Sequence, residues 1–223
     1  MNHWSVEDTN NTFVGGDGND TLVGGQGNDT LDGGAGIDKA VFTGKESDYL
    51  ITFNADGSVT VADQRFGWDV TTTPDGTDTL KNIEQIQFAD KTVNVSDLKA
   101  YTDAGHSSVM VGGSDYDISA THGGNVVIVG NGAAHFMTGS AGNDVFYVDN
   151  AQQVVFENVG NGDLGGVDEV RTTLASYALP DPNEPGILNH GKIENLTFVG
   201  TGDFHGTGNS LITSSPAAPV MTS

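Results

Sequence analysis

Aspartates recur at a fixed spacing of nine residues near the N-terminus of the chain. Asp20, Asp29 and Asp38 each close a six-residue segment that opens with two glycines, GGDGND, GGQGND and GGAGID. The unit is a nonapeptide written nearly three times between Gly15 and Lys39. Carboxylates at so regular a spacing would bind a hard cation if the fold brings them together.

Nine-residue repeats of this composition predict a parallel β-roll. Each repeat contributes a tight turn over its first six residues and a short strand over its last three, and two repeats make one coil. Glycine suits such turns because it adopts positive φ angles without steric cost. With two repeats per coil, the turn at 15–20 stacks on the turn at 33–38, and the turn at 24–29 lies on the opposite edge.

This stacking places the carboxylates of Asp20 and Asp38 opposite each other. Two carboxylates separated by roughly 4 to 5 Å repel by about 3 to 4 kcal/mol at an effective dielectric constant near 20. The stack therefore needs a cation. An ion that accepts many oxygen ligands, including backbone carbonyls, fits best, and this description favours calcium over zinc.

The motif GGxGxDxUx of these repeats resembles that of the repeats-in-toxin (RTX) family of haemolysin-type calcium-binding proteins. The resemblance implies that the earlier turn of a stacked pair contributes the carbonyls of its second and fourth residues and its aspartate. The later turn contributes the carbonyls of its first and third residues and its own aspartate. One calcium site would then use Gly16, Gly18 and Asp20 with Gly33, Ala35 and Asp38.

The turn at 24–29 needs stacking partners outside the strict repeat. Residues 6–14 match the nonapeptide in degenerate form, with Asn11 in the place of the aspartate, and are expected to cap this edge. Under the same resemblance the 24–29 turn would contribute Gly24, Gln26 and Asp29 toward one neighbour and Gly25 and Gly27 toward the other. We therefore expect residues 1–42 to form an N-terminal calcium β-roll.

Residues 43–104 are expected to form an antiparallel β accessory segment beside the roll. Two alternating stretches, 49–53 and 58–61, flank a strong hairpin turn at 54–57. The later pattern DGTDTLxNIExxxFAD resembles a segment found beside RTX arrays, although Lys91 stands where a glycine is expected. Residues 95–104 have the helix-like spacing of this segment and predict a short helix.

The nonapeptide frame returns in degraded form over residues 105–148, which we expect to form a second β-roll. Its inward positions become Ile128, Met137 and Phe146. The frame sets Asp117 opposite His135 and Asp144 opposite Val126, so that neither pair consists of two carboxylates. At most one further calcium is expected here, and the residues to hold it are Asp117, Gly139, Ala141 and Asp144.

Residues 149–210 resemble a second accessory unit common near RTX arrays, through the segments VDNA, GGVDEV and IENLTF. A stretch rich in proline and glycine at 180–192 predicts an exposed loop insertion. The tail at 211–223 is rich in Ser, Ala and Pro and is expected to be flexible. The predicted fold class is thus all-β, a parallel β-roll with an antiparallel segment and a second, degenerate roll.

Charge and composition exclude several function classes. Thirty acidic residues against eight basic ones give a formal net charge of -22, which argues against nucleic acid and anionic membranes as partners. No apolar run reaches transmembrane length, so we expect no membrane insertion. The chain has no cysteine, and calcium would have to supply the cross-links that disulfides give other secreted domains.

The N-terminus shows no signal peptide. RTX proteins leave bacteria by a one-step type I route that needs no such leader, so the resemblance implies a secreted or cell-surface location. The zinc-protease motif HExxH and the lipase motif GxSxG are both absent from the sequence.

Three function classes remain open. The leading one is a secreted, non-catalytic calcium-binding module that folds when calcium binds. The second is a calcium-dependent adhesin or carbohydrate-binding module that contacts an extracellular glycan or a cell surface, with Trp68, the 180–192 loop or a sheet edge as its contact. The third is an enzyme that modifies polysaccharide, such as an epimerase or lyase on a β-solenoid.

Overall fold

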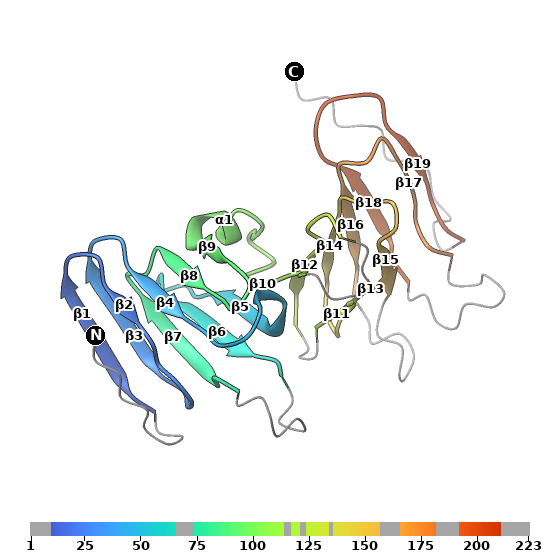
Figure 1. Ribbon diagram of the computed structural model, residues 1–223. Coiled ribbons are helices and arrows are strands. Elements are labelled where there is room, and N and C mark those ends of the chain that lie inside the picture. Colours follow the sequence, from blue (N-terminus) through green and yellow to red (C-terminus); the bar gives the residue numbers. More distant parts are fainter. Residues whose placement is uncertain are drawn as a thin grey trace.

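Strands dominate the computed structural model, which describes residues 10–65, 74–113, 117–120, 124–133, 136–156, 166–181 and 192–210. Most strand pairs are parallel, which confirms the predicted all-β fold with parallel rolls. Trp68, the tail at 211–223 and most of the 180–192 loop lie outside the described residues. Figure 1 shows two groups of strands, one at each end of the molecule, joined near β10.

The first coils of the N-terminal roll follow the repeat closely. They consist of β1 (Thr12–Asp17), β2 (Thr21–Leu22), β3 (Thr30–Ala35) and β4 (Lys39–Val41). β1 pairs in parallel with β3, and β2 pairs in parallel with β4. The partners Thr12 and Thr30 stand two repeats apart, as do Thr21 and Lys39, which is the coil length predicted from the nonapeptide.

After β4 the chain leaves the roll to form a hairpin. A 3-10 turn, η1 (Glu46–Asp48), leads into β5 (Tyr49–Phe53), which pairs antiparallel with β6 (Val59–Asp63). Gly57 in the connecting turn has a φ of 89°, a conformation that favours glycine. The hairpin predicted around residues 54–57 is therefore confirmed.

The chain then returns to the roll, where two strands of the expected antiparallel segment also pair in parallel with strands of the repeats. β7 (Thr77–Lys81) pairs antiparallel with β6 but parallel with β3, and β8 (Gln85–Gln87) pairs parallel with β4. The reason is burial, because Leu80 aligns with Leu31 and Ile86 with Ala40, all within one core. These two strands extend the inward apolar stripe of the repeats by another coil.

An antiparallel edge and a short helix complete this part of the chain. β9 (Thr92–Asn94) pairs antiparallel with β8 and leads into α1 (Val95–Lys99), which buries Leu98 against the roll. The helix is shorter than the predicted range. The hydroxyl of Thr102 donates to the Lys99 carbonyl at 2.8 Å, a local bond that competes with helical hydrogen bonding.

The second roll begins at β10 and stacks its strands in parallel. Its strands are β10 (Ser108–Val111), β11 (Asp117–Ser119), β12 (Val126–Val129), β13 (Phe136–Thr138), β14 (Val145–Val148), β15 (Val154–Phe156), β16 (Glu169–Thr172), β17 (Ser176–Ala178), β18 (Asn195–Phe198) and β19 (His205–Thr207). The predicted inward residues Ile128, Met137 and Phe146 are all fully buried. Because β14, β16 and β18 pair in parallel, residues beyond 148 continue the stack rather than starting a differently built unit.

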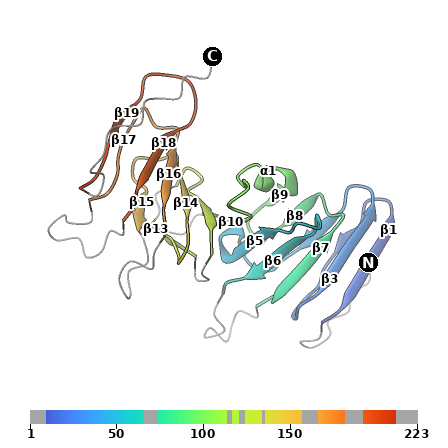
Figure 2. The ribbon, with the colours of Figure 1, turned by 180° about the vertical axis from the view of Figure 1, so that it is seen from behind.

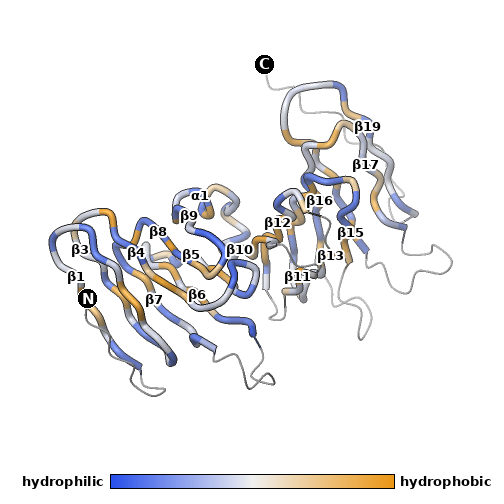
Figure 3. The backbone as a smooth tube through the Cα atoms, in the orientation of Figure 1, coloured by the Kyte–Doolittle hydropathy of each residue, from blue (hydrophilic) through white to orange (hydrophobic). Residues whose placement is uncertain are grey.

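One ten-stranded sheet runs through both rolls in the order β1-β3-β7-β6-β5-β10-β12-β14-β16-β18. The antiparallel β5–β10 pair joins the two halves, as both ribbon views show (Figures 1 and 2). Both faces of β12 are buried, since Val127 and Val129 belong to the first core whereas Val126 and Ile128 belong to the second. The hydropathy colouring shows apolar stretches on these central strands (Figure 3).

Lys91, which stands where a glycine was expected, forms an ion pair with a residue of the 3-10 turn η1. Its ammonium contacts the carboxylate of Glu46, whose side chain is 1% exposed. Burial raises the pKa of Glu46, and the neighbouring Lys91 works in the opposite direction. The lysine thus compensates a charge that would otherwise be buried alone.

Replacing Lys91 with Met should therefore destabilise the fold. We expect the free energy of unfolding to fall by roughly 2 kcal/mol, less than the 3 to 5 kcal/mol of a fully buried pair because Lys91 is partly exposed. The deficit relative to the unmodified chain should be largest above the folded-state pKa of Glu46. It should shrink as the pH falls through that pKa, because protonation removes the buried charge. Urea denaturation across pH measures this, with the exposed Lys99→Met as control, and equal deficits for the two variants would contradict it.

Candidate metal centre

The three glycine-rich turns of the N-terminal repeats are here numbered turn 1 (15–20), turn 2 (24–29) and turn 3 (33–38). Their second and fourth residues are glycines with positive φ, for example 111° at Gly16 and 95° at Gly34. A Cβ added to Gly34 would lie 2.1 Å from the carbonyl oxygen of Gly16. A Cβ on Gly36 would lie 2.0 Å from that of Gly18. The carbonyls of turn 1 that we predicted to bind metal therefore point into the contact with turn 3.

The sixth-position aspartates link one coil to the next through the backbone. The amide of Asp20 donates to Oδ1 of Asp38 at 2.7 Å, and the amide of Asn11 donates to Oδ1 of Asp29 at 2.7 Å. The structure thus brings Asp20 to Asp38, and Asn11 to Asp29, as the stacking model predicted. Each carboxylate uses one oxygen to bind the preceding coil.

A second ladder, which the sequence reasoning missed, runs beside the first through the fifth position. The amide of Ile37 donates to Oδ1 of Asn19 at 3.0 Å, and the amide of Asn28 donates to Oδ1 of Asn10 at 2.9 Å. Here the later coil donates to the earlier one, opposite to the aspartate ladder. The recurrence of Asn immediately before Asp in the first two turns was the available signal.

The second oxygen of each array aspartate is the unusual feature of these turns. Oδ2 of Asp20, Asp29 and Asp38 is buried and has no hydrogen-bond partner within the described part of the chain. A buried carboxylate oxygen without a partner is costly. On the edge of turns 1 and 3, Oδ2 of Asp20 and Asp38 and the carbonyls of Gly16 and Gly18 are hard oxygen donors of the kind that calcium prefers. No group of three or more acidic or histidine side chains suited to a metal occurs among the described residues, so backbone carbonyls have to complete the set.

Turn 2 has a neighbour on each side. Asn10 and Asn11 flank it on one side, as the degenerate repeat predicted. On the other side the amide of Asp29 donates to Oδ1 of Asp78 at 2.8 Å, across 49 residues of sequence. Gly76, with a φ of 92°, would place a Cβ 1.9 Å from the carbonyl oxygen of Gly27. Residues 75–78 therefore occupy the third to sixth positions of a further turn.

Asp78 was not among the predicted site residues. Its side chain is 2% exposed, and burial raises its pKa to about 7, with the neighbouring charges of Asp29, Asp75 and Asp63 acting in the same direction. The sequence signal was the segment Asp75-Gly76-Thr77-Asp78, which keeps the G-x-D spacing of the repeat. It was hidden because the hairpin interrupts the nine-residue frame.

On the edge of turn 3 the aspartate ladder ends at a glutamate. The amide of Asp38 donates to Oε2 of Glu84 at 2.8 Å, and Lys81 and Gln85, which flank Glu84, pair with Asp32 and Lys39. Only residues 82–84 fill the place that six residues occupy in turn 3, with Asn82 at a φ of 50°. Because glutamate is longer than aspartate, the carboxylate of Glu84 reaches the Asp38 amide from this shortened turn.

The second roll uses the same amide-to-carboxylate ladder, but the second oxygen of its carboxylate has a different environment. The amide of Val126 donates to Oδ1 of Asp144 at 2.8 Å, as the predicted frame requires. The amide of Asp144 in turn donates to Oδ1 of Asp168 at 2.7 Å, a second carboxylate on the following coil that the nonapeptide frame did not include. The spacing of 24 residues between them, rather than two repeats, concealed this pair.

Oδ2 of Asp144 has a protein partner, unlike the corresponding atoms of the array. The amide of Ser140 donates to it at 2.6 Å, and the Ser140 hydroxyl lies 3.4 Å away. Ser140 replaces the glycine found at this position in turns 1 to 3. The predicted ligands Gly139 and Ala141 belong to this same turn. The carbonyl of Ala141 accepts a hydrogen bond from a backbone amide of a neighbouring coil.

Asp117 is not where the predicted frame put it. It lies in β11 with Phe136 as its register partner, one residue away from the expected His135, which is outside the described residues. The slip lets Ile118 take the buried position at 2% exposure. Burial of the isoleucine decides the register, and Asp117 leaves the sixth position of the turn.

Comparison with known families agrees with this geometry. The model of the RTX calcium-binding nonapeptide repeat, in four copies, matches residues 7–40. Residues 7–40 are RTX calcium-binding repeats. The match includes the degenerate first repeat that contains Asn11 and ends before the hairpin, so Asp78 lies outside this RTX array. No curated protein matches the chain.

The described residues contain no helix with the length and apolar character needed to span a bilayer.

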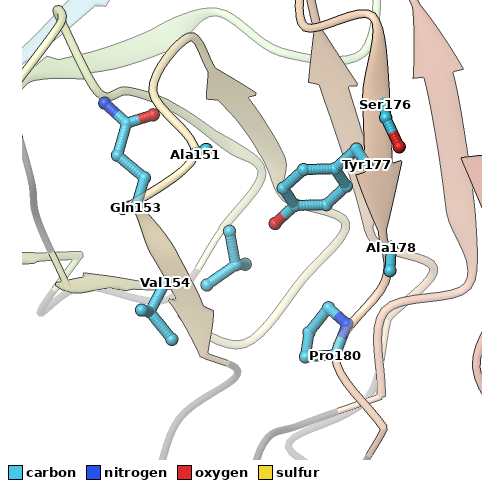
Figure 4. A pocket seen from close by; sticks show the side chains of 8 residues that line it. Ala151, Gln153, Val154, Ser176, Tyr177, Ala178 and Pro180 are labelled. Atoms are coloured by element: carbon cyan, nitrogen blue, oxygen red, sulfur yellow. The ribbon is translucent and has the colours of Figure 1, made fainter. Parts of the chain in front are cut away.

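The second roll has a hollow of about 300 Å³ beside Tyr177 and Pro180 (Figure 4). Burial raises the pKa of Tyr177 to about 12, which keeps its hydroxyl protonated at neutral pH. The amide nitrogen of Gln153, at its edge, already donates to Asp149 and to the Ala133 carbonyl, so it holds the turn rather than facing a ligand.

Substituting Gly34 by Ala tests the close approach of turns 1 and 3. The positive φ alone should cost about 1 to 2 kcal/mol, and the contact with the Gly16 carbonyl should add to that and displace a predicted ligand. Gly57→Ala is the control, because Gly57 has a similar φ but no atom within 4 Å of an added Cβ. We expect both to lower the melting temperature, and Gly34→Ala alone to weaken calcium binding in calorimetric titration. Equal calcium affinity in the two variants would contradict the ligand assignment.

Proposed function

We propose that the chain is a secreted, non-catalytic calcium-binding module whose RTX array folds when calcium binds. The observation that carries this proposal is the set of buried Oδ2 atoms of Asp20, Asp29 and Asp38, which have no partner in the described part of the chain. The Asp144 carboxylate of the second roll, with both oxygens bonded, shows how the same turn is completed by protein atoms alone. The array aspartates have no such partner for Oδ2 among the described residues, and a cation would take its place.

The energetics make folding sensitive to the metal. Calcium at ten times its dissociation constant stabilises a single site by only about 1.4 kcal/mol, so one site would give a shallow transition. In the array Asp29 and Asp38 each bind the backbone of the coil before them, which connects neighbouring coils. Sites coupled in this way favour a cooperative transition from unfolded to folded chain.

This dependence suits export through a type I route. Without calcium the opposed carboxylates hold the array open, and the chain would pass a channel unfolded. High calcium outside the cell would then fold it. The strongly acidic composition and the absence of cysteine support an extracellular protein that is cross-linked by metal rather than by disulfides.

The double variant Asp20→Asn with Asp38→Asn tests the proposal. Asparagine retains the Oδ1 acceptor for the Asp20 amide but removes both negative charges, so we expect the loss of at least one bound calcium per chain. The gain of β signal in far-ultraviolet circular dichroism should shift to higher calcium concentration. The matched control is Asp17→Asn with Asp203→Asn, two exposed carboxylates, which should titrate like the unmodified chain. If the unmodified chain melts at the same temperature in chelator and in millimolar calcium, the proposal is wrong.

A further inference from the structure

We propose that Asp29 and Asp78 hold a calcium ion between two turns that stand 49 residues apart in the sequence, and that this ion fastens the returning chain to the RTX array. The inference rests on the proposed function, because both require the array to bind calcium. It adds a site whose second half lies outside the matched repeats. Its consequence is a metal-dependent link between the array and the hairpin β5–β6.

The backbone contacts show that residues 75–78 stack on turn 2 as a true repeat turn does. The amide of Asp29 donates to Oδ1 of Asp78 at 2.8 Å, and the amide of Thr77 donates to Oδ1 of Asn28 at 2.8 Å. These are the two ladders, aspartate and asparagine, that join turns 1 and 3. The interrupted chain thus reproduces the geometry of an uninterrupted coil.

The junction between these turns shares one feature with the first site, a buried aspartate oxygen without a partner among the described residues. Oδ2 of Asp29 is buried without a described partner, and both Asp29 and Asp78 are 2% exposed. The carbonyl oxygen of Gly27 points at the α-carbon of Gly76. Two buried carboxylates and a backbone carbonyl at the contact between the turns offer oxygen donors of the kind that a hard divalent cation prefers. Asp75 stands in the third position of its turn, from which the later turn supplies a carbonyl.

The side chain of Asp75 explains how the chain returns to this position. Its carboxylate accepts hydrogen bonds from the Tyr49 hydroxyl at 2.5 Å and from the Thr43 hydroxyl and amide at 2.7 Å, and it lies 3.5 Å from Arg65. These partners belong to the hairpin and its approach. The turn is therefore held to the hairpin by Asp75, while its other side meets the array through Asp78.

The ion would hold turn 2 and Asp78 together at a contact that the covalent chain does not constrain. Between Val41, at the end of β4, and Asp75 the chain leaves the repeat and comes back, so covalent continuity does not keep turn 2 and Asp78 together. The parallel β3–β7 pairing and the metal site then share that task. Calcium at this site should raise the protection of the β7 amides more than that of β12, which packs within the second roll.

The experiment compares three full-length chains: the unmodified protein, Asp78→Asn, and Asp20→Asn with Asp38→Asn. Bound calcium is counted by equilibrium dialysis with elemental analysis, and amide exchange of residues 77–81 is followed with and without calcium. Asparagine at 78 keeps the acceptor for the Asp29 amide, and Asp17→Asn serves as the control for the loss of one negative charge. We expect Asp78→Asn to bind one ion fewer than the unmodified chain and to lose the calcium-dependent protection of β7.

The outcomes separate the two proposals. If the unmodified chain binds no calcium, the proposed function itself fails. If the Asp20/Asp38 variant loses an ion but Asp78→Asn binds as many as the unmodified chain with equal affinity, the site at Asp78 is wrong while the function stands. Should Asp78→Asn not fold, crystals of the unmodified protein grown in calcium decide. An anomalous-difference peak between Asp29 and Asp78 supports the site, and its absence beside a peak between Asp20 and Asp38 overturns it.

Discussion

The hydrogen bond from a backbone amide to the carboxylate of the next coil is the interaction on which the rest of this structure depends. It occurs at Asp38, Asp29 and Asp78 in the first roll and at Asp144 and Asp168 in the second. Each bond sets the register of a turn and buries a carboxylate in doing so. The remaining carboxylate oxygen then decides whether a turn needs a metal.

The two rolls resolve this requirement differently. In the array the positions four residues before the aspartates are glycines, and the carbonyl of Gly16 faces the neighbouring turn. In the second roll Ser140 at that position donates its backbone amide to Asp144 at 2.6 Å, and its hydroxyl donates to the Gly124 carbonyl at 3.1 Å. A neutral donor inside the turn takes over the role of a cation between turns. The turn in the second roll thus bonds both carboxylate oxygens to protein atoms, whereas each array aspartate keeps one oxygen without a partner among the described residues.

The aspartate ladders of the two rolls end in the same way. Glu84 accepts from the Asp38 amide, and Glu194 accepts from the Asp168 amide at 2.9 Å. Each glutamate follows a buried isoleucine, Ile83 or Ile193, which anchors the closing segment in the core. The additional methylene of glutamate lets the final coil bond to the ladder without a full glycine-rich turn. The paired occurrence of Ile-Glu in KNIEQ and GKIEN is the sequence trace of this ending.

Much of the local structure followed from sequence because it depends on short-range constraints. The nonapeptide period, its glycine positions and its inward apolar residue predicted the coil length, the Asp20–Asp38 contact and the Asn11 cap, all of which arise within two repeats. The hairpin at 54–57 followed from turn chemistry and strand alternation. In the second roll the buried stripe Ile128, Met137 and Phe146 followed from the degraded nonapeptide frame.

Only the tertiary structure decided which turns meet once the period is broken. Asp78 reaches Asp29 across the hairpin, Asp168 reaches Asp144 across a longer coil, and Asp117 loses its place because Ile118 is buried instead. Counting residues cannot anticipate these contacts, because an inserted segment changes the spacing while hydrophobic burial restores the stacking. By itself the sequence determined the chemistry of each turn through glycine and aspartate. The packing of apolar side chains between distant strands determined which turns became neighbours.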